Sequence, residues 1–339
     1  MRRWPQDWQL LPRDSILPAM SIIRLSLLLF AAGILLSSCA STADLTRAAA
    51  TASTVDPAQP FPESAFVEAG GISLHYRHWL PEAAPVGQVF LLHGFGSSTF
   101  TWRFLVPELL AAGWEIAAAD IPPFGYSSRE DTIAHPGYDR SATLWAVPEA
   151  LGWKDPIVLI GHSMGGLYAT ALAEGQPGRV RALVYLAGAV PADGKSAGGS
   201  PPFASLFAGS LEAQLHSWSG VKDSLKGFAS PGDVIPDAMV DGYAAPFQIP
   251  NGVKALFAWS DASAAQAPVH PASLKVPALL VWGQKDTAVP LAVGEKLAAV
   301  IAGSRLVVLP GQGHLVHELH PELVNPLVLG FLAGLQIAQ

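Results

Sequence analysis

The chain has 339 residues, a length typical of one large domain or two ordinary ones. Half of the residues are hydrophobic and only 14% are charged, which excludes disorder of the whole chain. The 20 basic and 27 acidic residues leave a formal charge of −7, which argues against a nucleic-acid-binding protein. The single cysteine, Cys39, excludes a framework of internal disulfides and any zinc or iron–sulfur site built from several cysteines.

The N-terminal segment predicts export. Residues 25–36 form a nearly pure apolar run, which is too short to span a bilayer and has the length of a secretory signal core. Directly behind it, Leu36-Ser37-Ser38-Cys39 resembles the lipobox of bacterial lipoproteins. That resemblance implies that Cys39 carries lipid and becomes the mature N-terminus.

The resemblance also indicates a location. Ala40 is not the Asp that often retains such lipoproteins at the inner membrane, so we expect anchoring at the outer membrane, on its periplasmic or surface side. An ordinary cleaved signal peptide with an incidental cysteine is the alternative. Met20 is a more typical start than Met1 for such a signal.

Composition and hydrophobic patterning divide the chain into five predicted segments. Residues 1–39 are the signal peptide with its lipobox, and residues 40–62, rich in Ala, Thr, Ser and Pro, are a flexible tether. Residues 63–191 and 273–339 form the two parts of an α/β core. Residues 192–272 carry Gly, Pro and Ser clusters with short helical fragments, which is too long for a loop and indicates an inserted cap.

Short apolar runs alternate with helical stretches along the core. Strands are expected over 66–67, 72–76, 89–92, 114–119, 156–160, 180–187, 276–282 and 305–309. Helices are expected over 104–112, 141–151, 167–174, 290–301 and 321–335. Strands that are apolar on both faces and separated by helices indicate a mostly parallel sheet covered on both sides.

A candidate nucleophile lies where a strand is followed at once by a helix. In Gly161-His162-Ser163-Met164-Gly165 the glycines permit a tight turn that lifts the Ser163 hydroxyl above the sheet. The same turn directs the backbone N–H of Met164, at the positive end of a helix, toward a developing oxyanion. A chance match, in which Ser163 merely caps a helix, is the alternative.

A serine nucleophile needs a base, and His314 is the candidate among ten histidines. It follows the last predicted strand in Gly311-Gln312-Gly313-His314, a loop whose glycines let the side chain project over the carboxyl edge of the sheet. His317 and His320 are rivals, but they fall in or next to the final helix, where surface histidines are common. His162 is expected to face away from Ser163.

The base in turn needs a carboxylate that orients it. Asp286 follows the strand that ends at Trp282 and is the preferred candidate. Asp193, which follows the preceding strand, is the competitor. A solvated loop aspartate is the structural alternative for either residue.

A second oxyanion donor is expected in the loop after an early strand. His93-Gly94-Phe95-Gly96 follows the strand that ends at Leu92, and the N–H of Phe95 is the natural donor. The two glycines also suggest a dinucleotide loop, but Thr99 occupies the place of the third glycine. The nucleotide interpretation is therefore weak.

Together these residues, in the order oxyanion loop, Ser, Asp, His, resemble the α/β-hydrolase superfamily from Phe66 to Leu335. The segment Asp120-Ile121-Pro122-Pro123-Phe124-Gly125-Tyr126-Ser127 is similar to a loop of that family, with Pro123 where glycine is usual. Gly283-x-x-Asp286-x-x-x-Pro290 matches a further stretch. The resemblance implies an eight-stranded, mostly parallel sheet with helices on both faces and a mainly helical cap over residues 192–272.

The resemblance also implies acyl transfer to water through a covalent intermediate on Ser163, with no metal or organic cofactor. If the aromatic residues of the cap line the site, they favour a small to medium, largely apolar ester as substrate; packing of the cap onto the body is the alternative role for these residues. A hydrolase of carbon–carbon bonds in ring-cleavage diketones, which uses the same three residues, is the first alternative. A non-catalytic binding protein on a hydrolase scaffold is the second, and such a protein commonly lacks one of the three.

Overall fold

The computed structural model describes most of the chain after its N-terminal segment. The described residues are 44, 46–47, 50, 55–129, 139–193, 208–252, 254–256, 258–259 and 267–337. The predicted signal peptide and Cys39 lie outside these ranges, as do 11 of the 23 residues of the predicted tether. In the described ranges, no helix combines the length and the apolar character needed to cross a membrane.

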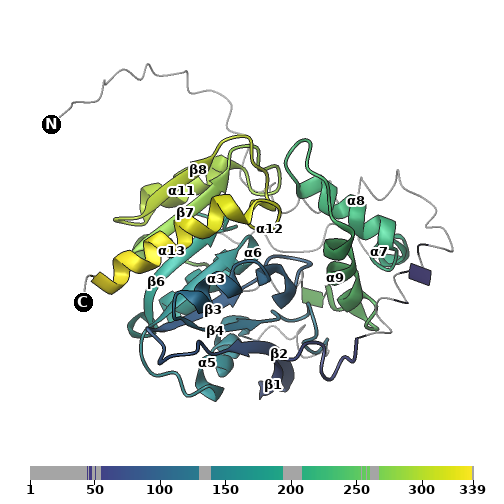
Figure 1. The fold of residues 1–339 in the computed structure, drawn as a ribbon, viewed down its shortest axis with the longest axis horizontal. Helices are drawn as coiled ribbons and strands as arrows, with labels where there is room; N and C mark the ends of the chain where they lie inside the picture. Colours follow the sequence, from purple (N-terminus) through teal and green to yellow (C-terminus); the bar gives the residue numbers. More distant parts are fainter. Residues whose placement is uncertain are drawn as a thin grey trace.

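An eight-stranded sheet forms the centre of the molecule (Figure 1). Its strands are β1 (Ser64–Ala69), β2 (Ile72–Trp79), β3 (Gln88–Leu92), β4 (Glu115–Ala119), β5 (Ile157–His162), β6 (Val180–Leu186), β7 (Ala278–Gly283) and β8 (Arg305–Leu309). Their order in space is β1-β2-β4-β3-β5-β6-β7-β8. The pairs β1–β2 and β2–β4 are antiparallel, and every other pair is parallel. This sheet confirms the predicted fold class.

Helices cover both faces of the sheet. The α-helices are α3 (Val106–Ala111), α4 (Arg140–Leu144), α5 (Ala146–Ala150), α6 (Met164–Gly175), α7 (Ala208–Leu215), α8 (Trp218–Phe228), α9 (Asp237–Phe247), α11 (Leu291–Val300), α12 (Val316–Leu319) and α13 (Pro321–Ile337). The 3-10 helices are η2 (Thr99–Trp102), η4 (Pro177–Arg179) and η6 (Pro271–Ser273). Residues of α3 and α13 share a buried cluster on one face, and residues of α4, α5, α6 and α11 share a cluster on the other.

The central strand β3 shows why both faces need a cover. Successive side chains of a strand point to opposite sides of the sheet. Phe90 and Leu92 therefore belong to one buried cluster, while Val89 and Leu91 belong to the other. All four side chains are fully buried, so an apolar run without polar alternation becomes a strand enclosed between two helical layers.

The helix predicted over 141–151 is divided in the structure. It forms α4 and α5, and Trp145 separates them. Pro148 explains the division, because it has no N–H to donate to the carbonyl of Leu144, four residues earlier. The short helix α5 starts anew and carries the proline in its first turn, where a missing N–H costs little.

The strand predicted over 156–160 continues to His162 in β5. Gly161 and His162 pair with Tyr185 and Leu186 of β6, so the neighbouring strand extends the pairing up to the turn. The last residue of β6 also holds the turn that follows β5, because the N–H of Ser163 donates to the carbonyl of Leu186 at 3.0 Å.

Between β6 and β7, where the sequence predicts the cap, the described residues form α7, α8 and α9. These helices lie together beside one end of the sheet (Figure 1). α8 and α9 share a buried apolar cluster that includes Trp218, Val221 and Met239, and Leu315 from the loop after β8 belongs to the same cluster. Ser217 caps the N-terminus of α8, because its side chain accepts a hydrogen bond from the N–H of Gly220 at 3.1 Å.

Candidate active site

Ser163 occupies the tight turn between β5 and α6. Its φ is 51° and its ψ is −121°, a backbone conformation that non-glycine residues rarely adopt. A Cβ atom at Gly161 would collide with the backbone of Gly165, and one at Gly165 would collide with the carbonyl of Leu92. Glycine is therefore required at both positions, because strand, turn and helix approach one another closely. The turn holds the half-buried Ser163 at the carboxyl end of β5.

His314 and Asp286 contact each other at the same edge of the sheet. The Nδ1 atom of His314 lies 2.8 Å from Oδ2 of Asp286, and the two side chains are 7% and 0% exposed. The other carboxylate oxygen accepts the N–H groups of Ala288 and Val289 at 2.9 and 2.8 Å. Because an ionised carboxylate only accepts, Nδ1 of His314 is assigned the proton, and Nε2 is left as the basic nitrogen.

The competing residues lie elsewhere. Asp193 is exposed in a turn after β6, whereas Asp286 is the carboxylate in contact with the imidazole of His314. His320 lies between α12 and α13, where its Nε2 is 3.0 Å from Oδ1 of Asp233. His317 is only 5% exposed, so the expectation of a surface histidine there is wrong.

The loop that carries His314 is fastened to the cap. The N–H of His314 donates to the carbonyl of Phe228, the last residue of α8, at 3.0 Å. The N–H of Gly313 donates to Oγ of Ser230 at 2.9 Å. A Cβ atom at Gly313 would lie 2.8 Å from the backbone of Ala229. The glycine thus permits a close approach of cap and loop, a role that the sequence analysis did not foresee.

His162 connects the serine turn, the His314 loop and the loop after β3. Its Nε2–H donates to the carbonyl of His314 at 3.2 Å, and the two rings are 4.7 Å apart between centroids. A Cβ atom at Gly94 would lie 2.8 Å from Nδ1 of His162 and 3.1 Å from Cβ of Ser163. Burial, together with the neighbouring His317 and His314, holds the pKa of His162 well below its ordinary value. The ring is therefore neutral.

The predicted oxyanion donors, Phe95 and Met164, belong to the two chain segments that meet at Ser163. Phe95 follows Gly94 directly, and Met164 is the first residue of α6. In the part of the chain that the structure describes, no hydrogen bond engages the N–H of either residue. Both groups are thus available to an acceptor from outside the protein.

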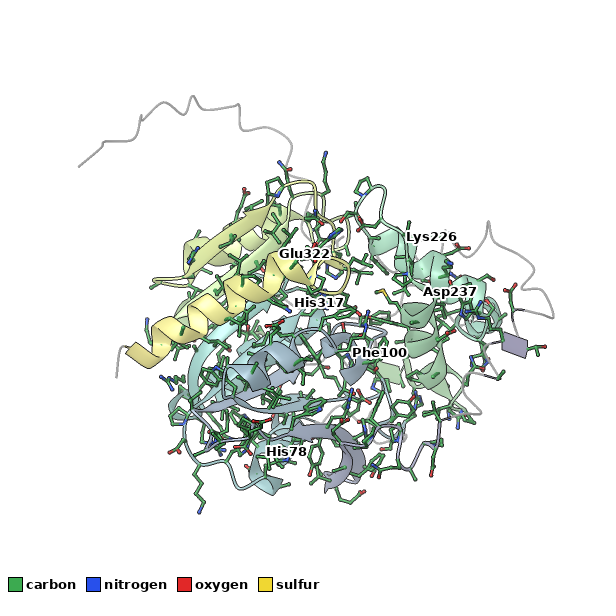
Figure 2. All side chains as sticks on the ribbon, viewed as in Figure 1. His78, Phe100, Lys226, Asp237, His317 and Glu322 are labelled. Atoms are coloured by element: carbon green, nitrogen blue, oxygen red, sulfur yellow. The ribbon has the colours of Figure 1, made fainter. Side chains whose placement is uncertain are left out.

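A buried polar cluster beside the site was missed by the sequence analysis. His317, labelled in Figure 2, stacks on His162 with 4.1 Å between ring centroids, and its Nε2 lies 2.9 Å from Oγ1 of Thr101. The fully buried side chain of Glu318 forms an ion pair with Arg103. It also accepts a hydrogen bond from the hydroxyl of Tyr243, on α9, at 2.5 Å. Glu318 therefore links the core to the cap.

We expect the buried histidines to make the fold sensitive to acid. Burial lowers the pKa of His317 to about 4. Glu318 opposes this shift, whereas His314 and Arg103 lower the pKa further. The imidazole of His317 has a pKa near 6.5 in the unfolded chain, so between pH 6.5 and 4 the unfolded chain binds a proton that the folded protein does not bind. The contribution of neutral His317 to the free energy of unfolding is complete above pH 6.5. It falls by roughly 3 kcal/mol as the pH is lowered to 4.

Urea unfolding of the wild-type protein and of His317→Gln at pH 7 and pH 4 measures this contribution. The free energy of unfolding of the variant should fall by about 3 kcal/mol less than that of the wild type. An equal fall in both proteins would contradict the assignment of His317 as a neutral buried group.

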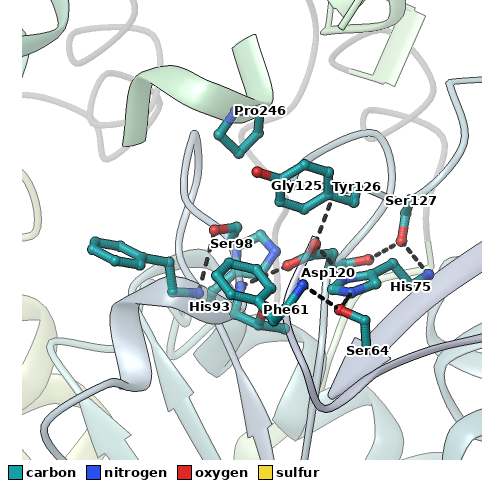
Figure 3. Close-up of polar contacts among 12 residues, drawn as sticks. Phe61, Ser64, His75, His93, Ser98, Asp120, Gly125, Tyr126, Ser127 and Pro246 are labelled. Carbon is teal, nitrogen blue, oxygen red and sulfur yellow. Dashed lines mark hydrogen bonds and ion pairs between the residues drawn. The ribbon is translucent and has the colours of Figure 1, made fainter. Parts of the chain in front are cut away.

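Asp120 is a second buried group with an organising role. Its Oδ2 lies 2.7 Å from Nδ1 of His75 and accepts the N–H of Tyr126 at 2.8 Å, as Figure 3 shows. Its Oδ1 accepts the N–H of Thr99 at 2.6 Å. Burial alone would raise the pKa of Asp120, but His75, His93 and the Tyr126 N–H outweigh it and keep the pKa below its ordinary value. The carboxylate thus joins the loops after β3 and β4.

A pocket of about 420 Å³, including the part open to solvent, lies between the core and the cap. From the core it is lined by Gly96, Ser97, Ser98, Pro123, Phe124, Gly125 and Arg129. From the cap side it is lined by Leu215, Tyr243, Pro246, Phe247, Gly252 and Leu256. Gly96, in the wall of the pocket, directly follows Phe95. The centroid of the Phe95 ring lies 5.2 Å from that of the Phe124 ring and 5.6 Å from that of the Trp259 ring. The pocket therefore borders the candidate oxyanion donor and is mostly apolar.

The structure thus brings the predicted residues of the core to one region. Ser163, His314, Asp286, Phe95 and Met164 lie on turns and loops at the carboxyl edge of the sheet, and Cys39 lies outside the described residues. Among the described residues, no group of three or more His, Cys, Asp or Glu side chains could hold a metal ion.

Comparison with known proteins agrees with this architecture. A family profile described as "alpha/beta hydrolase fold" matches residues 88–321. An uncharacterised hydrolase of Bacillus subtilis is 32% identical over 270 residues, which cover 77% of this chain and 95% of the relative. A pimeloyl-acyl-carrier-protein methyl ester esterase of Neisseria meningitidis is 31% identical over 272 residues, covering 76% of this chain and 97% of the relative.

Solved structures share the fold. A serine hydrolase involved in carbazole degradation superposes with a TM-score of 0.65 at 23% sequence identity. The match covers 80% of this chain and 98% of that protein.

Proposed function

The chain belongs to the α/β-hydrolase family, and on this premise we propose that it is a serine hydrolase that cleaves small to medium, largely apolar carboxylic esters. The observation that carries the proposal is the buried pair of His314 and Asp286, 2.8 Å apart, beside the strained turn of Ser163. A related protein named as a methyl ester esterase supports an ester substrate.

In the proposed reaction, Oγ of Ser163 attacks the ester carbonyl while Nε2 of His314 takes its proton. The N–H groups of Phe95 and Met164 stabilise the negative oxygen of the tetrahedral intermediate. When the carbon–oxygen bond breaks, His314 returns the proton to the leaving alcohol, and an acyl-enzyme remains. His314 then takes a proton from a water molecule as the water attacks the acyl group. When the bond between the acyl carbon and Oγ breaks, His314 returns that proton to Oγ of Ser163, and the acid is released. Asp286 orients the ring and stabilises its charged form throughout.

The lining of the pocket supports a substrate with apolar groups. This lining is mostly apolar, which favours hydrophobic acyl or alcohol groups. Of the cap aromatics noted in the sequence, Tyr243 and Phe247 line the pocket, while Trp218 lies in the cluster between α8 and α9. The cap therefore supplies part of the proposed specificity.

A substrate panel tests the proposal. Hydrolysis of p-nitrophenyl esters with acyl chains of two to ten carbons is compared with cleavage of a vinylogous diketo acid, the substrate type of carbon–carbon hydrolases. We expect turnover of the esters, with the highest kcat/KM at short or medium chain length. Cleavage of the diketo acid alone would overturn the ester proposal in favour of carbon–carbon bond hydrolysis.

We also propose that the exported chain is anchored to the outer membrane through lipid on Cys39. The support is the apolar segment 25–36 followed by Leu36-Ser37-Ser38-Cys39. Metabolic labelling with a palmitate analogue should label the wild-type protein and fail to label Cys39→Ser, which should leave the membrane fraction. Equal labelling of both proteins would contradict the proposal.

A further inference from the structure

Arg129 places a positive charge in the wall of the pocket. Its Nη2 donates to the carbonyl of Gly125 at 2.9 Å and to the carbonyl of Pro246, in the last turn of α9, at 3.0 Å. Its Nη1 makes a long contact of 3.4 Å with the carbonyl of Ser127. The guanidinium is therefore held in one place between the core and the cap, and every acceptor that holds it is neutral.

The hydrogen-bonding capacity of Arg129 is not exhausted by these contacts. A guanidinium has five N–H donors, and the three carbonyls use three of them. Nε is buried and has no partner. Among the described residues, no carboxylate lies within 4.0 Å of the guanidinium nitrogens. The charge thus has spare donors and no ion-pair partner in that part of the chain.

Asp120, the buried carboxylate whose charge acts on Arg129, already has other partners. Asp120 pairs with His75 and accepts two backbone N–H groups, as described above. Burial lowers the pKa of Arg129 to about 10 against the opposing effect of Asp120, so the side chain remains charged at neutral pH.

The rest of the pocket offers little to balance a cation. Phe124, Leu215, Phe247 and Leu256 contribute apolar side chains to its wall. A wholly apolar ligand would remove water from the guanidinium without replacing its interactions, which is unfavourable. A ligand with a negative group would instead satisfy the spare donors through a charge-assisted hydrogen bond.

We propose that Arg129 is a specificity-determining residue that selects esters carrying a carboxylate on the part of the substrate that enters the pocket. One guanidinium balances one negative charge, which suits a carboxylate better than a phosphate monoester with a charge of about −1.5 to −2. The apolar wall then contacts the hydrocarbon chain between ester and carboxylate. This inference rests on the proposed ester hydrolysis and names its substrate class.

Two matched pairs of substrates test the inference. Mono-p-nitrophenyl adipate against p-nitrophenyl hexanoate places the charge on the acyl side, and 6-acetoxyhexanoate against hexyl acetate places it on the alcohol side. For at least one pair, the wild-type protein should favour the charged ester by about 10- to 100-fold in kcat/KM. Arg129→Gln should remove most of that preference, and Arg129→Lys should retain part of it.

The ratio within each pair separates recognition from structural damage. If Arg129 only fastens the cap through the carbonyl of Pro246, Arg129→Gln lowers both members of a pair in parallel and leaves the ratio unchanged. Arg305→Gln is the matched control, because it removes one positive charge from an exposed position on β8. It should leave the ratio unchanged.

The results also distinguish this inference from the function on which it rests. No preference for a carboxylate in either pair, or a preference that survives in Arg129→Gln, would overturn the inference while ester turnover persists. Absence of turnover of all four esters by the wild-type protein would overturn the proposed function itself, and the inference with it.

Discussion

Replacement of Ser163 by alanine is expected to lower kcat for an ester by about 10⁵- to 10⁶-fold. The variant retains the imidazole of His314 and the proposed oxyanion donors, but it has no oxygen on which an acyl-enzyme can form. Alanine lacks only the hydroxyl, and the turn is defined by glycines 161 and 165, so the fold should be retained. Steady-state kinetics with p-nitrophenyl butyrate and thermal unfolding of both proteins measure the two effects.

A fluorophosphonate probe provides an independent readout of the same residue. The serine oxygen displaces fluoride and forms a stable phosphonyl ester, so the mass of the wild-type protein should increase by one adduct. Ser163→Ala should remain unlabelled. Equal labelling of both proteins would show that another residue is the nucleophile and would remove the basis of the proposed mechanism.

Asp286→Asn is expected to lower kcat by about 10⁴-fold without unfolding the protein. The amide oxygen of asparagine can still accept the N–H groups of Ala288 and Val289, which now bond to Oδ1 of Asp286. The amide nitrogen then faces Nδ1 of His314 and favours the tautomer whose Nε2 carries the proton. His314 in that form cannot take the proton of Ser163.

Asp193→Asn is the matched control for this change. Asp193 is exposed after β6, whereas Asp286 is the carboxylate in contact with His314, so kcat of the control should stay within about twofold of the wild type. Undiminished turnover in Asp286→Asn, together with a loss in Asp193→Asn, would move the acidic role to Asp193. Circular dichroism and urea unfolding of both variants establish that the kinetic comparison concerns folded protein.

The fold class and the positions of most elements follow from local features of the sequence. Apolar runs such as residues 89–92 and 276–282 predict strands buried on both faces, and the structure places the corresponding strands β3 and β7 within the sheet. Ser163, the candidate nucleophile, can also be recognised from local sequence, because the tight turn that carries it requires glycine at positions 161 and 165. Where a local rule was overlooked, at Pro148, the predicted helix was too long.

The buried polar groups around the site could not be assigned in the same way. His317, Glu318 and Tyr243 come from α12 and α9, and nothing in their local sequence indicates that a carboxylate would be buried between a tyrosine and Arg103. The same holds for Arg129, whose partners at Gly125 and Pro246 lie in a core loop and in the cap. Charged side chains in loops are usually solvated, and only the packing of distant segments removes their water.

The sequence by itself determined the parallel sheet, the serine turn and the order of the candidate residues, because hydrophobic periodicity and glycine requirements act over a few neighbouring positions. Only the tertiary structure decided that Asp286 is the carboxylate in contact with His314. It also decided that the His314 loop is fastened to α8, and that Arg129 faces a pocket. These are contacts between segments far apart in the chain, and their partners are selected by how the strands and the cap pack together.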